Sequence, residues 1–391
     1  MIFPIDTEYG CYMYNNKTGL ITKDDKPITI DNKFISPGYN RKDLKIILGR
    51  SCNGQCSYCM QGNHSDRIIK PTMAEYHTFI LNLSELIDKE NYTSITFFGG
   101  EPLLYWNQLQ DITIQLKNKG LEFGIITNGI LMDTNKAKFI LNNNITFCLS
   151  HDGPGQYQRG KDPLENNTES RKSIDFLYSQ KHCMSFNSVF TKNNYNLSEI
   201  VEYFDRLGFP DIFIGELEPY VPSGNLDEQF LITQDISDAF TKNIIDAIIK
   251  YGMQRFECDH DFKLIINQHL DACKGIYPNV ETHCPATRHR HTAVDLYGNS
   301  YICHNVEYDA QLNMYTYNNR GNINQNIFHD RYIPGWGLTD ADCEDCMVRL
   351  LCRACPIKTY DVHRKECVGQ KAYHLGTMMA SFIYLLNSDK V

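Results

Sequence analysis

The chain has 391 residues, of which 42% are hydrophobic and 22% charged, with a formal net charge of −9. The length suffices for more than one structural unit, and the acidic balance argues against nucleic acid or an anionic membrane as partner. The first residues lack the basic and apolar pattern of a signal peptide, and no apolar run approaches the ~18–20 residues of a membrane span. We therefore expect a cytoplasmic protein with no membrane partner.

Cysteine is frequent, with fifteen residues in the chain. Secreted proteins use such numbers for disulfides, whereas proteins of reducing compartments use them to bind metal. Because the sequence shows no secretion signal and many cysteines lie two to five residues apart, we favour metal binding.

Residues 1–42 form the first expected unit. The run Tyr12-Met13-Tyr14, the turn-like Asn15-Asn16-Lys17-Thr18-Gly19 and the following Leu20-Ile21 are typical of a β-hairpin. Two interpretations stay open. The hairpin edge accepts a peptide as an added strand, or the hairpin only covers the next unit.

From residue 43 to about 235, apolar β-type runs alternate with helical patterns. The expected strands cover 44–48, 94–98, 122–127, 145–150, 185–191 and 211–215, and the expected helices cover 72–89, 106–118, 134–142, 169–179 and 197–207. This alternation predicts an α/β fold with a parallel sheet and crossover helices. Residues 236–283 are expected to form a helical connection to the rest of the chain.

The first strand leads into Cys52-Asn53-Gly54-Gln55-Cys56-Ser57-Tyr58-Cys59. Three thiolates hold three corners of a [4Fe–4S] cube, whereas structural zinc and electron-transfer clusters use four protein ligands. The spacing therefore indicates a cluster with one iron left open for a small molecule. On the spacing alone, zinc or a chance pattern stays an alternative.

Polar residues and glycines follow the next strands, in the runs Gly99-Gly100-Glu101-Pro102, Thr127-Asn128-Gly129 and Ser150-His151-Asp152-Gly153. Active sites of parallel α/β barrels lie at the carboxyl ends of the strands, and paired glycines let backbone approach a ligand closely. We expect one shared site there, with polar turns that bind nothing as the alternative.

The run Cys-x3-Cys-x-aromatic-Cys, followed by Gly-Gly-Glu-Pro, resembles the signature of the radical S-adenosylmethionine (radical SAM) enzymes. The resemblance implies a partial (β/α)6 barrel of the TIM type over residues 43–235. It also implies that Cys52, Cys56 and Cys59 bind a [4Fe–4S] cluster whose open iron chelates SAM. The implied SAM contacts are Tyr58 near the adenine, Gly99, Gly100 and Glu101 at the methionyl amine, Ser150 at the carboxylate or ribose, and Asn128.

Nine cysteines follow residue 257. Paired Cys-x2-Cys knuckles of zinc sites usually lie ~15–20 residues apart, but here only five residues separate Cys346 from Cys352. Residues 284–391 instead resemble a SPASM domain, which carries two auxiliary [4Fe–4S] clusters. One departure is the spacing of Cys352 and Cys355, with two residues between them rather than three. The resemblance assigns Cys284, Cys303 and Cys355 to the first cluster, and Cys343, Cys346, Cys352 and Cys367 to the second. For the fourth ligand of the first cluster we favour Cys273, with Cys258 or an open iron as alternatives.

The resemblance implies that an electron from an external donor, such as flavodoxin or ferredoxin, drives cleavage of SAM to a 5′-deoxyadenosyl radical. Auxiliary clusters accept a second electron, so we expect a net oxidation. The chain looks most like maturases of ribosomally made precursor peptides, particularly those that form three-residue cyclophanes. In these products an aromatic ring carbon is joined to the β-carbon of a residue two positions on.

Thioether formation, sulfatase maturation and a non-catalytic metal-cluster scaffold stay as alternatives. Sulfatase maturases have an Asp where this chain has His304, which ranks that activity lower. His151 and His304 are candidate proton acceptors, with structural hydrogen bonding as the alternative for each. A separate protein or the hairpin edge would recognise the leader part of the precursor peptide.

Overall fold

The computed structural model describes residues 1–7, 10–30, 34, 42–59, 71–220, 228–256, 259–278, 293–301, 304, 315–316, 341–352 and 360–387. Of the expected cluster ligands, Cys258, Cys284, Cys303 and Cys355 lie outside these residues. In the described part of the chain, no helix combines the length and the apolar character needed to cross a membrane.

Six parallel strands make up one side of a nine-stranded sheet, from its edge at β10 to β5. They are β5 (Asp43–Ile47), β6 (Ser94–Phe98), β7 (Glu122–Thr127), β8 (Ile145–Ser150), β9 (Met184–Phe190) and β10 (Phe213–Pro219). Each strand pairs in parallel with the next one in sequence. The predicted parallel arrangement is confirmed, although the last strand begins later and runs further than the predicted 211–215.

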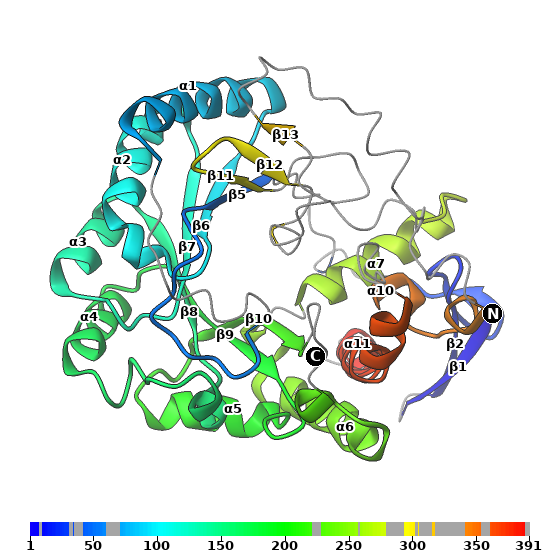
Figure 1. Cartoon of the computed structure of the whole chain (residues 1–391). Coiled ribbons are helices and arrows are strands. Elements are labelled where there is room, and N and C mark those ends of the chain that lie inside the picture. Colours follow the sequence, from blue (N-terminus) through cyan, green and yellow to red (C-terminus); the bar gives the residue numbers. More distant parts are fainter. Residues whose placement is uncertain are drawn as a thin grey trace.

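Five helices connect these strands and cover the outer side of the sheet, which curves into an arc (Figure 1). They are α1 (Met73–Glu90), α2 (Trp106–Leu116), α3 (Thr134–Asn142), α4 (Thr168–Ser179) and α5 (Leu197–Arg206). Local sequence sets their ends. Thr72 and Glu75 form a capping box at the start of α1, and Asn91 ends that helix in the left-handed conformation. These five helices match the predicted ones within three residues.

The sheet continues beyond β5 with strands from the last third of the chain. β11 (Ala293–Asp295) pairs in parallel with β5, and β12 (Asn299–Tyr301) and β13 (Tyr315–Thr316) follow in antiparallel order. Gly298 lies in the turn between β11 and β12 with φ +82°, a conformation that favours glycine. No pattern in the sequence indicated this extension.

Three long helices lie beside the open side of the arc: α6 (Gln234–Tyr251), α7 (Asp259–Cys273) and α11 (Tyr360–Asn387) (Figure 1). The helical character expected after residue 236 is confirmed as two helices, α6 and α7. α6 packs closely on α11, because a Cβ atom built on Gly376 would lie 2.8 Å from Cβ of Ile244.

The N-terminal residues form a separate antiparallel sheet of four strands. These are β1 (Ile2–Thr7), β2 (Gly10–Asn15), β3 (Ile21–Lys23) and β4 (Lys26–Pro27). The expected hairpin is confirmed as β2 and β3. The buried face of this sheet packs on α7, α10 (Arg349–Cys352) and α11, with a core of Ile5, Tyr14, Ile21, Ile265, Val348, Met378 and Phe382.

Both edges of this sheet carry a proline, Pro4 in β1 and Pro27 in β4. The N–H of Asn16 donates to the carbonyl of Met1 over 3.2 Å. Because antiparallel pairs alternate along a ladder, the nitrogen of Pro4 then faces outward, where it has no hydrogen to donate. Edge prolines hinder the addition of a further strand. This geometry favours the interpretation of the sheet as a cover, and the covered elements are the C-terminal helices.

Candidate active site

The three cysteines of the first motif lie in the loop that follows β5. A Cβ atom built on Gly54 would lie 3.3 Å from Sγ of Cys52 and 3.9 Å from Sγ of Cys56. Both thiols therefore stand next to the same glycine, where a side chain would crowd them. The pKa of Cys52 is raised to about 11, mainly by burial and also by Glu101 and the thiols of Cys56 and Cys59, against the lowering effect of the Gly54 N–H. The loop gathers thiols in a setting that disfavours free thiolates.

These residues fit a bound iron–sulfur cluster. A buried thiolate becomes favourable when a metal supplies the positive charge. Within the described ranges, no three His, Cys, Asp or Glu side chains are grouped tightly enough for a single metal ion. A cube is less demanding, because each thiolate binds a different iron. Next to the loop, the buried atoms Ser51 Oγ and Gln158 Nε2 have no hydrogen-bond partner among the described residues, which also fits a site that a bound group completes.

Gly99 and Gly100 pack against the start of the cysteine loop. A Cβ atom on Gly99 would lie 2.4 Å from the carbonyl oxygen of Gly49, and one on Gly100 would lie 2.3 Å from that of Arg50. The N–H of Gly100 donates to Gly49 over 2.9 Å, and the N–H of Glu101 donates to Ser51 over 3.0 Å. In the structure the glycines allow contact between two backbone segments. Their expected contact with SAM stays a prediction.

The Glu101 carboxylate joins the ends of β6 and β7. It accepts hydrogen bonds from the N–H of Leu103 (2.9 Å), the hydroxyl of Thr127 (2.6 Å) and the N–H of Asn128 (2.8 Å). Burial raises the pKa of Glu101 to about 6, against the lowering effect of these bonds. The described partners of Glu101 are thus internal, and its role at the methionyl amine stays a prediction.

Asn128 reaches the cysteine loop from the end of β7. Its Nδ2 donates to Oδ1 of Asn53 over 2.9 Å and lies 3.8 Å from Sγ of Cys52. The structure therefore brings together Asn128 and the first cysteine, which the sequence places 76 residues apart.

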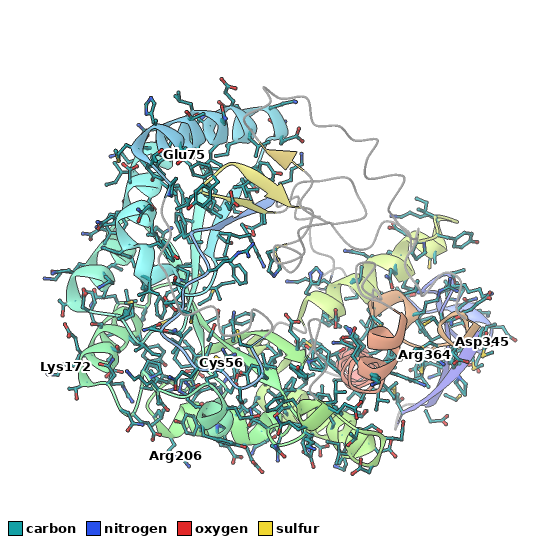
Figure 2. The ribbon with its side chains drawn as sticks, in the orientation of Figure 1. Cys56, Glu75, Lys172, Arg206, Asp345 and Arg364 are labelled. Atoms are coloured by element: carbon teal, nitrogen blue, oxygen red, sulfur yellow. The ribbon has the colours of Figure 1, made fainter. Side chains whose placement is uncertain are left out.

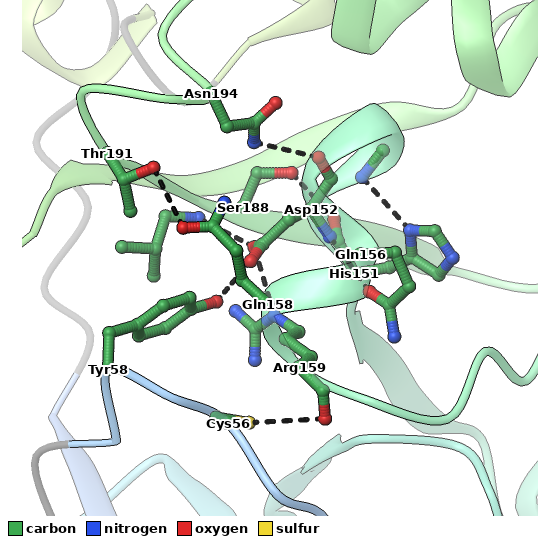
Figure 3. A network of polar contacts seen from close by, with 12 residues as sticks. Cys56, Tyr58, His151, Asp152, Gln156, Gln158, Arg159, Ser188, Thr191 and Asn194 are labelled. Atoms are coloured by element: carbon green, nitrogen blue, oxygen red, sulfur yellow. Dashed lines mark hydrogen bonds and ion pairs between the residues drawn. The ribbon is translucent and has the colours of Figure 1, made fainter. Parts of the chain in front are cut away.

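Tyr58 points into the protein. Its ring lies 5.8 Å from that of Phe230 and 6.2 Å from that of Tyr220, between ring centroids. Its hydroxyl donates to Asp152 (Figure 3). This position assigns Tyr58 to an aromatic cluster, and its expected contact with adenine stays a prediction.

No motif in the sequence indicates a role for Gln158, the last residue of the 3-10 helix Gly153–Gln158 after β8, or for Arg159, which follows it. The two carbonyl groups bind the cysteine loop, and the Arg159 side chain forms an ion pair with Asp152. Buried polar residues in a turn leave no periodic hydrophobic pattern in the sequence. The only available indication was their position a few residues after Ser150 in a run of Gly and polar residues.

The two candidate residues at the end of β8 differ in exposure. Ser150 is half-buried on the inner side of the sheet, whereas His151 is fully buried. Nδ1 of His151 accepts from the N–H of Gly153 (3.0 Å), so Nε2 carries the hydrogen that it donates to Asp162 (3.2 Å). With both nitrogens bonded inside the protein, His151 fits the structural alternative better than proton transfer.

His304 lies over the inner face of β5 and β6. Its Nε2 is 3.4 Å from Nζ of Lys45, and its ring is 4.8 Å from that of Phe98. Burial and the charge of Lys45 hold the pKa of His304 well below its usual value. The lowered pKa makes this imidazole a weak base, so the expected role of His304 as proton acceptor gains no support and stays a prediction.

Four C-terminal cysteines come together from three helices. Cys343 lies in α9 (Ala341–Glu344), Cys352 ends α10 and Cys367 lies in α11, while Cys346 lies between the first two helices. Burial raises the pKa of Cys352, and the thiols of Cys367, Cys346 and Cys343 raise it further. These are the four residues expected to bind the second auxiliary cluster, and that role stays a prediction.

Cys273 is the last residue of α7 and is exposed. Its Sγ lies 3.6 Å from Nε2 of His269. Its predicted partners in the first auxiliary cluster are outside the described residues, so its role as a ligand stays a prediction.

Residues 46–174, from β5 to α4, match the family model described as the Radical SAM superfamily. This segment is similar to the domain shared by radical SAM enzymes. Its match includes all three cysteines of the loop and the glycine-rich ends of β6 to β8.

Two curated relatives extend the similarity beyond this domain. The radical SAM cyclopropyl synthase TigE of Paramaledivibacter caminithermalis is 25% identical over 263 residues, which cover 61% of this chain and 53% of TigE. The cysteine-type anaerobic sulfatase-maturating enzyme of Clostridium perfringens is 28% identical over 210 residues, which cover 50% of this chain and 56% of that enzyme. The chain thus spans about half the length of the curated relatives that it matches.

Solved structures share the fold over most of the chain. Native anSMEcpe with bound AdoMet has a TM-score of 0.62 at 17% identity and covers 88% of this chain and 98% of its own. Streptococcus suis SuiB bound to precursor peptide SuiA has a TM-score of 0.55 at 18% identity and covers 82% of this chain and 72% of its own. At these identities the likeness shows the fold alone, and it extends well beyond residues 46–174.

Proposed function

We propose that this chain is a radical SAM enzyme that oxidatively modifies a ribosomally made precursor peptide. The proposed product is a cyclophane, in which an aromatic ring carbon is joined to the β-carbon of a residue two positions on. The observation that carries the proposal is the cysteine loop at the carboxyl edge of an open parallel sheet, held there by the ends of β6, β7 and β8.

Cys52, Cys56 and Cys59 would hold the [4Fe–4S] cluster that binds SAM. The bound cluster and SAM supply one-electron chemistry able to remove a hydrogen atom from an unactivated C–H bond. The residues of this chain position the loop: Gly99 and Gly100 permit the contact of β6 with the loop, and Asn128 bonds to it from β7. An external donor such as flavodoxin or ferredoxin would supply the electron.

The inner face of the sheet supports a polar substrate such as a peptide. Its partly exposed side chains include the polar Lys45, Thr96, Thr146 and Ser150 and the apolar Phe98 and Ile126. The opposite faces of the same strands carry the apolar core beneath the helices. A surface with both polar and apolar side chains suits a peptide, which offers backbone hydrogen-bonding groups and side chains of both kinds.

The C-terminal thiols support an oxidation. Cys343, Cys346, Cys352 and Cys367 would bind one auxiliary cluster, and Cys284, Cys303 and Cys355, with Cys273, a second one. Clusters of this kind accept an electron, which a bond-forming oxidation of the peptide must release. The similarity to TigE and the fold shared with SuiB agree with a peptide substrate.

The test is co-expression of this chain with the short reading frame next to its gene, followed by mass spectrometry of the peptide. A loss of two hydrogens that maps to a carbon–carbon link is expected, and Cys56→Ala should abolish it. Anaerobic reconstitution should give about twelve irons per chain if three cubes form. Zinc with little iron would support a non-catalytic scaffold, and an unmodified peptide would contradict the peptide maturase.

Sulfatase maturation is the second candidate, favoured by the sequence similarity to the Clostridium perfringens enzyme. A sulfatase-derived peptide with Cys or Ser at the modified position separates the two. Formation of formylglycine on that peptide supports the second candidate. A link from a cysteine sulfur in the neighbouring precursor would indicate thioether formation instead.

A further inference from the structure

The backbone of Gln158 and Arg159 holds the cysteine loop in place. The carbonyl of Gln158 accepts from both the N–H (2.8 Å) and the hydroxyl (3.1 Å) of Ser57. The carbonyl of Arg159 accepts from the N–H of Gln55 over 3.4 Å and lies 4.0 Å from Sγ of Cys56 (Figure 3). These contacts surround Cys56 on both sides in the sequence, so the position of this thiol depends on residues 158 and 159.

The side chain of Arg159 is part of a buried charge pair at the same place. Its Nε lies 2.9 Å from Oδ1 of Asp152, whose side chain is fully buried, while that of Arg159 is 14% exposed. The guanidinium carbon lies 5.5 Å from the ring centroid of Tyr58, and the Tyr58 hydroxyl donates to Asp152. The N–H of Val189 also donates to Asp152, over 3.0 Å. Arg159, Asp152 and Tyr58 thus form one network beside the loop.

Stability alone is a weak reason for such a network. Burial of two charges costs about as much as their attraction returns, and apolar replacements of buried pairs are often neutral or stabilising. The location of the pair points to another role. Tyr58 lies between Cys56 and Cys59 in the sequence, and its ring contacts the guanidinium of Arg159. In a poorly hydrated interior a fixed charge acts strongly on its neighbours. The reduction potential of an iron–sulfur cluster depends on nearby charges and hydrogen bonds.

We propose that Arg159 is a positioning residue whose charge, held in place by Asp152, raises the reduction potential of the cluster bound at Cys52, Cys56 and Cys59. The inference rests on the proposed function, since it requires a redox-active cluster at these cysteines. A positive charge beside the cluster favours its reduced form and so eases entry of the electron. The Asp152 carboxylate orients the guanidinium and limits this effect.

The experiment is a potentiometric titration of the anaerobically reconstituted full chain, followed by electron paramagnetic resonance. The signal that changes when SAM is added identifies the cluster of the loop. Arg159→Gln should lower its midpoint potential, Asp152→Asn should raise it, and Arg159→Lys should leave it near the wild-type value. Opposite shifts from two members of one network distinguish a charge effect from loss of packing, which would disturb the loop in the same way in both variants.

Two controls are available in the chain. Arg206 also lies against an aromatic ring, 5.3 Å from that of Tyr203, but on the exposed side of α5 and away from Cys56 (Figure 2). Arg206→Gln should leave the potential unchanged. Tyr58→Phe removes a hydroxyl and no charge, so it should shift the potential less than either charge variant.

Shifts of Arg159→Gln and Asp152→Asn in the same direction, or no shift in either, would overturn the inference. If Arg159→Gln does not retain iron, Asp152→Asn is compared with Arg159→Lys, which keeps the charge. A midpoint potential of Asp152→Asn above that of Arg159→Lys supports the inference, and equal potentials overturn it. A wild-type chain that binds no iron at the loop overturns the proposed function as well. A wild-type cluster with unshifted variants overturns this inference alone.

Discussion

Glu101 at the end of β6 accepts a hydrogen bond of 2.8 Å from the backbone N–H of Asn128 at the end of β7. The same carboxylate also binds Leu103 and Thr127, while the side chain of Asn128 continues to the cysteine loop. One buried acid thus links three segments around the site.

Glu101→Gln should destabilise the fold. If the amide oxygen keeps the bonds to Leu103 and Thr127, the NH₂ group faces the N–H of Asn128, and two donors oppose each other. An unsatisfied buried group costs about 1–3 kcal/mol, so the free energy of unfolding should fall by that amount in urea titrations. The matched control is Glu85→Gln on the exposed side of α1, which should have little effect. Equal stability of both variants would contradict the assigned hydrogen bonds.

The cost of Glu101→Gln should depend on pH. The pKa of this acid is about 6 in the folded chain against an ordinary value of 4.5, so the folded state holds its proton more tightly than the unfolded state. The stability that the wild type gains is present below pH 4.5 and is lost as pH rises through about 6. The wild type should therefore exceed the variant by more at pH 5 than at pH 7, with about 1 kcal/mol of difference between the two. A difference in the free energy of unfolding that grows toward pH 7 would contradict the raised pKa of Glu101.

Gly100→Ala should displace the cysteine loop, because the new Cβ would lie 2.3 Å from the carbonyl oxygen of Arg50. We expect a loss of iron retained after anaerobic reconstitution and a lower free energy of unfolding by about 1–3 kcal/mol. Gly124→Ala in β7 is the control, since its Cβ would meet its neighbours at 3.6 Å or more. Normal iron content in Gly100→Ala would show that the loop tolerates the shift.

His151→Gln tests the structural interpretation of this histidine. The substitution disturbs the bonds to Gly153 and Asp162 inside the protein, so we expect a lower free energy of unfolding by about 1–3 kcal/mol. Cleavage of SAM per folded, cluster-containing chain should stay near the wild-type rate. Normal stability together with lost turnover would instead indicate a proton acceptor.

Local pattern predicted the central part of the fold well. Runs such as Ser94–Phe98 and Ile145–Ser150 are apolar and end at glycine or polar residues, and their bounds match the structure. β11 was not predicted, because a strand of three residues is too short to show a periodic pattern. Its partner β5 also lies some 250 residues earlier in the chain, and local sequence patterns carry no information about so distant a pairing. The effect of the edge prolines on strand addition could be inferred only from the strand register of the N-terminal sheet.

The sequence predicted those parts of the candidate site that depend on cysteine spacing and on the residues that follow each strand. The contact of Asn128 with the cysteine loop follows from parallel strands that end at one edge. The partners of Glu101 and His151 did not follow, because hydrogen bonds inside a core depend on side chains from several elements. The Asp152–Arg159 pair was missed for the same reason.

The pairing of β11 with β5 has a consequence for synthesis on the ribosome. β5, which leads into the cysteine loop, emerges early, whereas the strand that covers its free edge appears only at residues 293–295. Until then the backbone groups at the free edge of β5 are unpaired, and such edges pair with other chains. Contacts this distant in sequence also form slowly. A shortened chain ending after α7 would therefore aggregate rather than behave as a smaller enzyme, and chaperone demand should be greatest while the last third is still being made.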